Sequence, residues 1–220
     1  MCLPVSSLWY TLSWPSWDGS SGDKDILNAK ADYMLKKIVA IGPESTGKST
    51  LCELLASHYK TAWVPEYARE YLMKNGTSYT FADLEKIARE QVGTEDEYAL
   101  SLLNNADFAP VSSDNLDKKR LFIDTDMYVI KVWGEYVFDQ APAYALDQIV
   151  QRRYDLYLLC NTDLPWVKDE LREYPDLESR QELYQIYKDI MINQSVPWVD
   201  ISGSPEERLQ KAIAAVEKYC

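Results

Sequence analysis

The chain has few of the side chains that bind transition metals. Its only histidine is His58, and its four cysteines stand at positions 2, 52, 160 and 220, with no Cys-x-x-Cys pair among them. Zinc sites need several cysteine or histidine ligands at close spacing, so we expect no zinc site. Scattered cysteines, two of them within apolar runs, are typical of reduced structural thiols.

Long apolar segments are missing as well. No stretch approaches the roughly 20 apolar residues that span a bilayer. Residues 1–17 are aromatic and apolar, but they lack the basic start and the clean apolar centre of a secretory signal. The sequence therefore predicts a cytoplasmic protein with no membrane partner.

Basic residues are in deficit, since the formal net charge is -12, from 35 acidic and 23 basic residues. Most of such a surface would repel a phosphate polymer, so no nucleic-acid partner is expected. A small anion can still bind where backbone amides, a lysine and a metal ion converge. The composition favours a small-molecule ligand and leaves open whether the chain forms a homo-oligomer.

Two regions differ in pattern. Residues 1–33 carry three tryptophans, two prolines and a Gly/Ser cluster without a sustained period, which indicates an irregular N-terminal extension. The alternative is a docking arm whose tryptophans pack on the body or on a partner. Residues 34–220 are regular and of a length that suits one domain.

From residue 35 onward, short apolar segments alternate with helical patterns, which predicts an α/β fold with a parallel sheet. The expected strands are 36–41, 62–64, 121–123, 156–160 and 198–201. The expected helices are 48–59, 67–74, 81–104, 127–138, 143–152, 177–193 and 205–219. Ser204 as N-cap and Pro205 at the first helical position support the start of the last helix.

A phosphate-binding loop follows the first strand. Residues 42–49, Gly-Pro-Glu-Ser-Thr-Gly-Lys-Ser, match G-x-x-x-x-G-K-[ST] between a strand and a helix. In this motif the lysine reaches the β and γ phosphates and the serine ligates Mg²⁺. ATP and Mg²⁺ are therefore the predicted cofactors. The predicted ATP-binding residues in and after the loop are Gly42, Glu44, Ser45, Thr46, Gly47, Lys48, Ser49 and Thr50.

Acidic residues stand at the ends of two other strands. Asp124 and Asp126 follow the strand 121–123, where Asp124 is predicted to hold Mg²⁺ and Asp126 to orient the acceptor hydroxyl or the metal's water shell. The alternative is that these acids cap the next helix. Glu66 and Arg69 follow the strand 62–64. Glu66 is predicted to accept a proton, and Arg69 to neutralise charge on the transferring phosphoryl group. The alternative is an ordinary ion pair at the start of a helix.

A charged segment with prolines near both ends, residues 161–175, follows the strand 156–160 and indicates a lid. Arg172 is predicted to close over the phosphates of ATP together with Arg180 of the next helix. Trp166 is predicted to offer a flat face to a ring or a cation. The alternative is an ordinary charged surface loop.

These motifs together resemble the ribosylnicotinamide kinase domain of the bacterial NAD-biosynthesis regulator. The resemblance rests on Gly-Pro-Glu-Ser-Thr-Gly-Lys-Ser, Pro-Glu-Tyr-Ala-Arg-Glu, Ile-Asp-Thr-Asp and Asn-Thr-Asp-Leu-Pro-Trp-Val-Lys-Asp-Glu-Leu-Arg, and it spans about residue 35 to the C-terminus. It implies a P-loop NTPase fold of the nucleotide-kinase type, with a five-stranded parallel sheet, flanking helices and a lid.

The same resemblance implies phosphorylation of the 5′-hydroxyl of nicotinamide riboside to nicotinamide mononucleotide. By position, Glu66, Arg69 and Asp124 would face the substrate or the metal, and Trp166 would lie near the pyridinium ring. The DNA-binding and adenylyltransferase portions of that regulator have no counterpart in this sequence, so neither repression nor adenylyl transfer is expected.

Other readings stay open at this stage. A kinase of another nucleoside or of a vitamin alcohol fits the same motifs. A GTPase switch is disfavoured because the guanine-reading Asn-Lys-x-Asp is missing. A non-enzymatic ATP-binding regulator would need the phosphate loop but not the acids Asp124 and Glu66.

Overall fold

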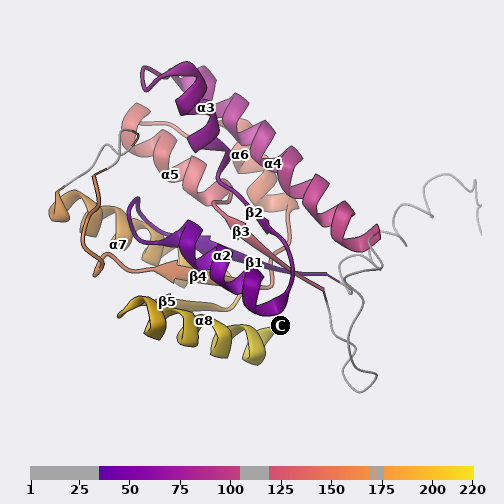
Figure 1. The fold of residues 1–220 in the computed structure, drawn as a ribbon. Helices are drawn as coiled ribbons and strands as arrows, with labels where there is room; N and C mark the ends of the chain where they lie inside the picture. The colour runs from indigo at the N-terminus through magenta and orange to yellow at the C-terminus, as the bar shows by residue number, and fades with distance from the viewer. Residues whose placement is uncertain (1–34, 105–118, 169–170, 172–175) are drawn as a thin grey trace, which may run out of the picture.

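A five-stranded parallel sheet forms the centre of the molecule, which we analysed as a computed structural model (Figure 1). The structure describes residues 35–104, 119–168, 171 and 176–220, so the predicted extension 1–33 lies outside the described residues. The strand order is β2-β3-β1-β4-β5. The strands are β1 (Leu35–Ile41), β2 (Trp63–Val64), β3 (Lys119–Asp124), β4 (Leu156–Cys160) and β5 (Trp198–Ile201).

The central strand β1 explains why the strands are apolar runs rather than alternating patterns. It pairs with β3 on one side and with β4 on the other, where Val39 is level with Ile123 and Tyr157. Alternate residues of a strand point to opposite faces of the sheet, and helices bury both faces here. Val39 accordingly packs into one core cluster, whereas Ile38 packs into the other.

Helices cover both faces of the sheet (Figure 1). One core cluster lies against residues of α4 (Phe81–Asn104), α5 (Met127–Phe138) and α7 (Leu177–Asn193). The cluster on the other face is closed by α2 (Lys48–Tyr59) and α8 (Pro205–Tyr219). The molecule therefore has the three-layer arrangement that the alternation of strands and helices predicts.

Two further helices form a third apolar cluster with α4 and α5. They are α3 (Tyr67–Asn75) and α6 (Ala143–Gln151). Their buried residues include Ala68 and Ala145, which pack with Leu84 and Ile130. This cluster fixes α3 and α5 relative to one another, and these two helices supply one wall of the cavity considered below.

The predicted elements agree closely with the observed ones. The bounds of α2, α4, α5, α7 and α8 are those predicted from the sequence. The bounds of α3 and α6 each differ from the predicted ones by one residue. The start of α8 is a capping box, in which Ser204 and Glu207 each accept a hydrogen bond from the other's backbone N–H. None of the helices in the described ranges is both long and apolar enough to cross a bilayer.

Candidate active site

The phosphate loop connects β1 to α2 at the carboxyl edge of the sheet. Gly42 has a φ of 137°, and a Cβ atom there would lie 2.7 Å from the carbonyl oxygen of Cys160, so β4 packs directly against the loop. Ser45 and Gly47 also have positive φ, of 56° and 78°, and α2 begins directly after Gly47. A loop that curls in this way before a helix directs its N–H groups toward one anion.

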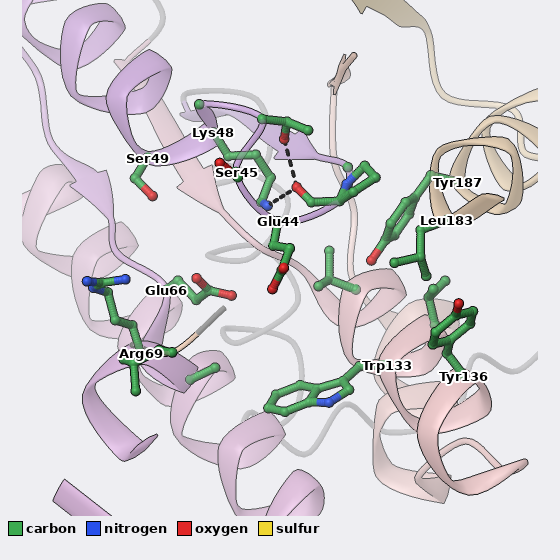
Figure 2. A pocket seen from close by; sticks show the side chains of 18 of the residues that line it. Glu44, Ser45, Lys48, Ser49, Glu66, Arg69, Trp133, Tyr136, Leu183 and Tyr187 are labelled. Carbon is green, nitrogen blue, oxygen red and sulfur yellow. Dashed lines mark hydrogen bonds between the residues drawn. The ribbon is translucent and has the colours of Figure 1, made fainter. Parts of the chain in front are cut away.

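Lys48 lies within this loop. Its side chain is largely buried, and its Nζ donates a hydrogen bond of 2.9 Å to the carbonyl oxygen of Pro43. The hydroxyl of Thr46 donates to the same oxygen at 2.7 Å (Figure 2). The ammonium group is thus held beside the N-terminus of α2, where it adds a full positive charge to the partial charge of the helix.

Ser49 and Asp124, predicted as the magnesium ligands, are in direct contact. The Ser49 hydroxyl donates to Asp124 Oδ2 at 2.5 Å, although the two residues are 75 positions apart. Burial, and next the charge of Glu66, raise the pKa of Asp124 to about 6, while Lys48 acts in the opposite direction. A hydroxyl and a carboxylate at a helix N-terminus are oxygen donors that suit Mg²⁺, so these residues fit the predicted ion.

Asp126, predicted to orient the acceptor hydroxyl or the metal's water shell, lies at the start of α5. It is the N-cap of α5, where Oδ1 accepts from the Tyr128 N–H at 3.0 Å and Oδ2 accepts from the Tyr157 hydroxyl at 2.9 Å. Burial raises the pKa of this carboxyl to about 7. Asp126 does not line the cavity beside the phosphate loop, and its contacts are those of the helix-capping alternative.

A cavity of about 410 Å³ opens beside the phosphate loop (Figure 2). It contains two predicted acceptor-site residues, Glu66 and Arg69, from the segment where β2 leads into α3. Glu66 Oε1 accepts a hydrogen bond of 3.4 Å from the Thr125 hydroxyl, next to Asp124. The structure therefore brings the second and third strand ends to the phosphate loop. The lining residues are 42–50, Glu66, Ala68, Arg69, Leu72, Val129, Val132, Trp133, Tyr136, Val137, Leu171, Leu183 and Tyr187.

The aromatic wall of this cavity was not predicted from the sequence. Trp133 and Tyr136 of α5 and Tyr187 of α7 line it on the side facing the loop (Figure 2). The Trp133 Nε1–H donates to the Tyr79 hydroxyl at 2.8 Å, which fixes the orientation of the indole. Aromatic residues in an apolar helix are ordinarily core residues, so the pattern alone gave no signal for them.

The predicted lid is described only in part. Trp166 is half-buried and does not line the cavity, and its Nε1 is buried without a hydrogen-bond partner. The backbone N–H of Val167 donates to the Ser45 hydroxyl at 3.1 Å, so this segment does contact the phosphate loop. Arg172 and its neighbours 169–170 and 173–175 lie outside the described residues.

The chain is similar to several known proteins. It is 26% identical over 173 residues to the trifunctional NAD biosynthesis/regulator protein NadR of Escherichia coli. The aligned region covers 77% of this chain and 38% of the E. coli protein. Its fold matches NadR in complex with NR, with a TM-score of 0.60 and 21% identity, over 86% of this chain and 52% of the other. It also matches thymidylate kinase from Ehrlichia chaffeensis, with a TM-score of 0.52 and 12% identity. This match covers 83% of the present chain and 98% of the thymidylate kinase.

These matches agree with the geometry of the site. The chain spans less than half the length of the E. coli protein, and the solved structures share its P-loop fold. The model of the AAA domain family matches residues 37–208, which hold the phosphate loop, the strand-end acids and Arg208. The chain is a P-loop protein that belongs to the AAA domain family.

Proposed function

We propose that this protein transfers the γ-phosphoryl group of ATP to the 5′-hydroxyl of nicotinamide riboside. The observation that carries the proposal is the shared cavity, in which the phosphate loop faces Glu66, Arg69 and the indole of Trp133. The name of the similar solved structure, NadR in complex with NR, supports the choice of acceptor. Kinase chemistry of this kind depends mainly on positioning and on electrostatic stabilisation.

On the donor side, the loop amides and Lys48 bind the phosphates, and Ser49 and Asp124 would hold Mg²⁺. When bound, Mg²⁺ supplies positive charge that neutralises the phosphate oxygens. The short hydrogen bond between Ser49 and Asp124 fixes both oxygens before the nucleotide arrives. The lid arginine Arg172 remains part of the proposal as a further cation at the phosphates.

On the acceptor side, Glu66 orients the attacking hydroxyl and accepts its proton. The hydroxyl oxygen forms a bond to the γ phosphorus while the bond between that phosphorus and the bridging oxygen breaks, and ADP leaves. Arg69 lies in the same cavity, where its charge counters that of the transferring group. Asp126 has no role in this step, because its two carboxylate oxygens are engaged at the start of α5.

The aromatic wall supports a cationic acceptor. A pyridinium ring is attracted to the face of an indole, with a stabilisation that rises from about 0.5 kcal/mol in water to about 2 kcal/mol when the pair is shielded from it. Trp133 is oriented for this contact by its hydrogen bond to Tyr79, and Glu44 and Glu66 add carboxylates to the same cavity. In this proposal Trp133 takes the position that the sequence analysis gave to Trp166.

The test compares two acceptors that differ in charge. Phosphorylation of nicotinamide riboside and of its neutral dihydro form is measured by mass analysis of the product in the presence of Mg²⁺ and ATP. Trp133→Leu is expected to raise KM for the cationic acceptor roughly 10-fold, in line with the cation–π energy, and to change KM for the neutral form much less. Trp166→Leu is the control, with KM for both acceptors near the wild-type value.

Three outcomes would overturn the proposal in different ways. Phosphorylation of another nucleoside or of a vitamin alcohol in place of nicotinamide riboside would leave a kinase with a different acceptor. ATP binding without phosphorylation of any acceptor would indicate a regulator. If Trp166→Leu raises KM for nicotinamide riboside more than Trp133→Leu does, the pyridinium ring binds at Trp166 of the lid and not at Trp133.

A further inference from the structure

Three basic side chains are buried in the described part of the chain, and all three contact the phosphate loop. They are Lys48, Arg180 of α7 and Arg208 of α8. Lys48 donates to the Pro43 carbonyl, Arg180 Nη2 donates to the Ser45 carbonyl at 3.2 Å, and Arg208 Nη1 donates to the Thr46 carbonyl at 3.0 Å. Burying a charged group is costly, so this concentration at one loop calls for an explanation.

The planarity of the peptide bond shows how contacts to the loop carbonyls can orient the loop N–H groups. In a trans peptide the C=O of one residue and the N–H of the next point in opposite directions. A donor that holds the Thr46 carbonyl on the outer side of the loop therefore turns the Gly47 N–H inward, toward the anion position at the start of α2. Arg180 does the same for the peptide that joins Ser45 to Thr46.

We propose that Arg208 is a positioning residue for nucleotide binding, which acts through the backbone of the phosphate loop. The guanidinium of Arg208 does not line the cavity. It holds the Thr46–Gly47 peptide in the orientation that phosphate binding needs, and it places a positive charge behind the loop. This role rests on the proposed binding of ATP at residues 42–49.

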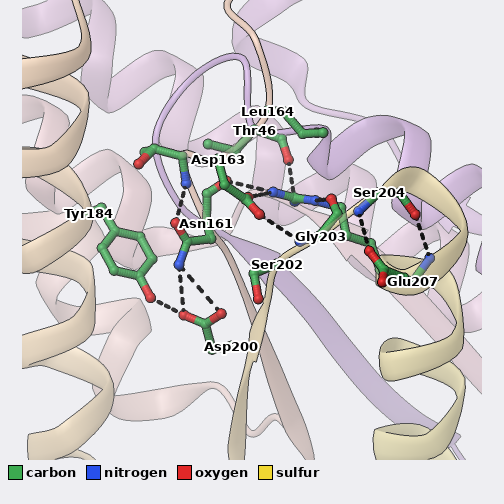
Figure 3. A network of polar contacts seen from close by, with 12 residues as sticks. Thr46, Asn161, Asp163, Leu164, Tyr184, Asp200, Ser202, Gly203, Ser204 and Glu207 are labelled. Atoms are coloured by element: carbon green, nitrogen blue, oxygen red, sulfur yellow. Dashed lines mark hydrogen bonds and ion pairs between the residues drawn. The ribbon is translucent and has the colours of Figure 1, made fainter.

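Arg208 can fix the loop because it is itself fixed at three other points. Its Nε donates to the Gly203 carbonyl at 3.0 Å and its Nη2 donates to the Asn161 carbonyl at 2.9 Å, which lie just beyond the ends of β5 and β4. It also forms an ion pair with Asp163, whose Oδ2 accepts from the Gly203 N–H at 2.6 Å (Figure 3). The phosphate loop is thereby tied to two neighbouring strand ends.

The geometry needs the planar, forked guanidinium of arginine. The donors Nε, Nη1 and Nη2 each serve a different segment of the chain, and a lysine would present one ammonium group that cannot reach all of them. Hydrogen bonds from a charged donor are stronger than those between neutral groups, and a buried carbonyl that loses its donor destabilises the folded state. The arrangement therefore predicts that Arg208→Lys behaves more like Arg208→Ala than like the wild type.

The experiment measures two properties of Arg208→Ala and Arg208→Lys below their unfolding temperatures. The first is the Kd for ATP with Mg²⁺, by titration calorimetry, which is expected to rise 10-fold or more. The second is amide hydrogen exchange in peptides that cover residues 42–49, which is expected to become faster, while exchange in β1 stays as in the wild type. The second measurement needs no nucleotide, so it tests whether Arg208 orders the loop separately from whether the loop binds ATP.

Lys211→Ala is the matched control. Lys211 is a cation one turn further along α8, and its Nζ donates to the carbonyl and hydroxyl oxygens of Ser202. Its loss is expected to leave both the Kd and the exchange of the loop unchanged. The inference is overturned if the Arg208 variants lose stability while the Kd and loop exchange match the wild type, or if Lys211→Ala gives the same changes as they do.

Discussion

Replacing Gly42 by alanine is expected to destabilise the protein by about 2–6 kcal/mol. A φ of 137° is a backbone conformation that side chains with a Cβ rarely adopt, at a cost of about 1–3 kcal/mol. The new methyl group would also lie 2.7 Å from the Cys160 carbonyl oxygen, which belongs to the backbone of β4 and cannot rotate away. Overpacking of this kind adds about 1–3 kcal/mol.

The same substitution at Gly93 is the control, and the sign of its effect should be opposite. Gly93 lies inside α4 and is exposed, and an added Cβ atom would meet nothing within 4 Å. Alanine is a better helix former than glycine by about 0.8–1 kcal/mol, so Gly93→Ala is expected to stabilise the protein by about that amount. Urea unfolding at equilibrium measures both variants.

The Gly42 variant should also bind ATP more weakly, because a shifted loop no longer directs its N–H groups to one point. Calorimetric titration with ATP and Mg²⁺ tests this at a temperature where the variant is folded. If the free energy of unfolding of Gly42→Ala lies within about 0.5 kcal/mol of the wild-type value, the loop and β4 are not in close contact and the predicted clash is refuted.

Three shorter predictions concern a carboxyl group, a helix cap and the loop lysine. The pKa of Asp126 is raised by folding to about 7, so its contribution to stability is fully present below pH 4 and is lost as the pH rises through 7. Urea unfolding between pH 4 and 8 should therefore show the wild type losing stability relative to Asp126→Asn, and parallel curves would contradict the shift. Ser204→Ala removes the capping box of α8 and is expected to cost about 1 kcal/mol in the same assay, whereas a neutral effect would mean that the cap is frayed in solution. Lys48→Ala should abolish turnover of ATP with an unchanged far-UV circular dichroism spectrum, and wild-type turnover would exclude the phosphate loop from the chemistry.

The strands and most helices could be predicted from the sequence for a physical reason. Strands buried on both faces are continuous apolar runs, and their carboxyl ends carry the polar residues that face ligands. Strand β2 is shorter than the predicted strand 62–64. It comprises only Trp63 and Val64, and it pairs with β3. The contact between Ser49 and Asp124 also follows from this logic, because the ends of β1 and β3 are adjacent.

The residues that the sequence analysis missed are those whose pattern has an ordinary explanation. Trp133 lies in an apolar helix and looks like a core residue, and Arg208 lies in the charged pattern of α8 and looks like a surface residue. Their roles appear only when segments far apart in the chain meet, as Arg208 and Thr46 do across 162 positions. Asp126 was ambiguous for a similar reason, since a carboxylate before a helix suits both a cap and a metal ligand.

The acidic surface does not prevent phosphate binding at the loop, because the exposed acids act on ATP from a distance and the buried cations act on it at close range. Exposed acids repel ATP during its approach, but salt screens charges that are separated by more than about 8 Å at physiological ionic strength. The cations Lys48, Arg180 and Arg208 are buried at the phosphate loop, where screening is weak and their positions are fixed by hydrogen bonds. The net charge of -12 therefore disfavours a long polyanion, which would lie across the acidic surface, and is expected to have little effect on the three phosphates of the ATP proposed to bind within one loop.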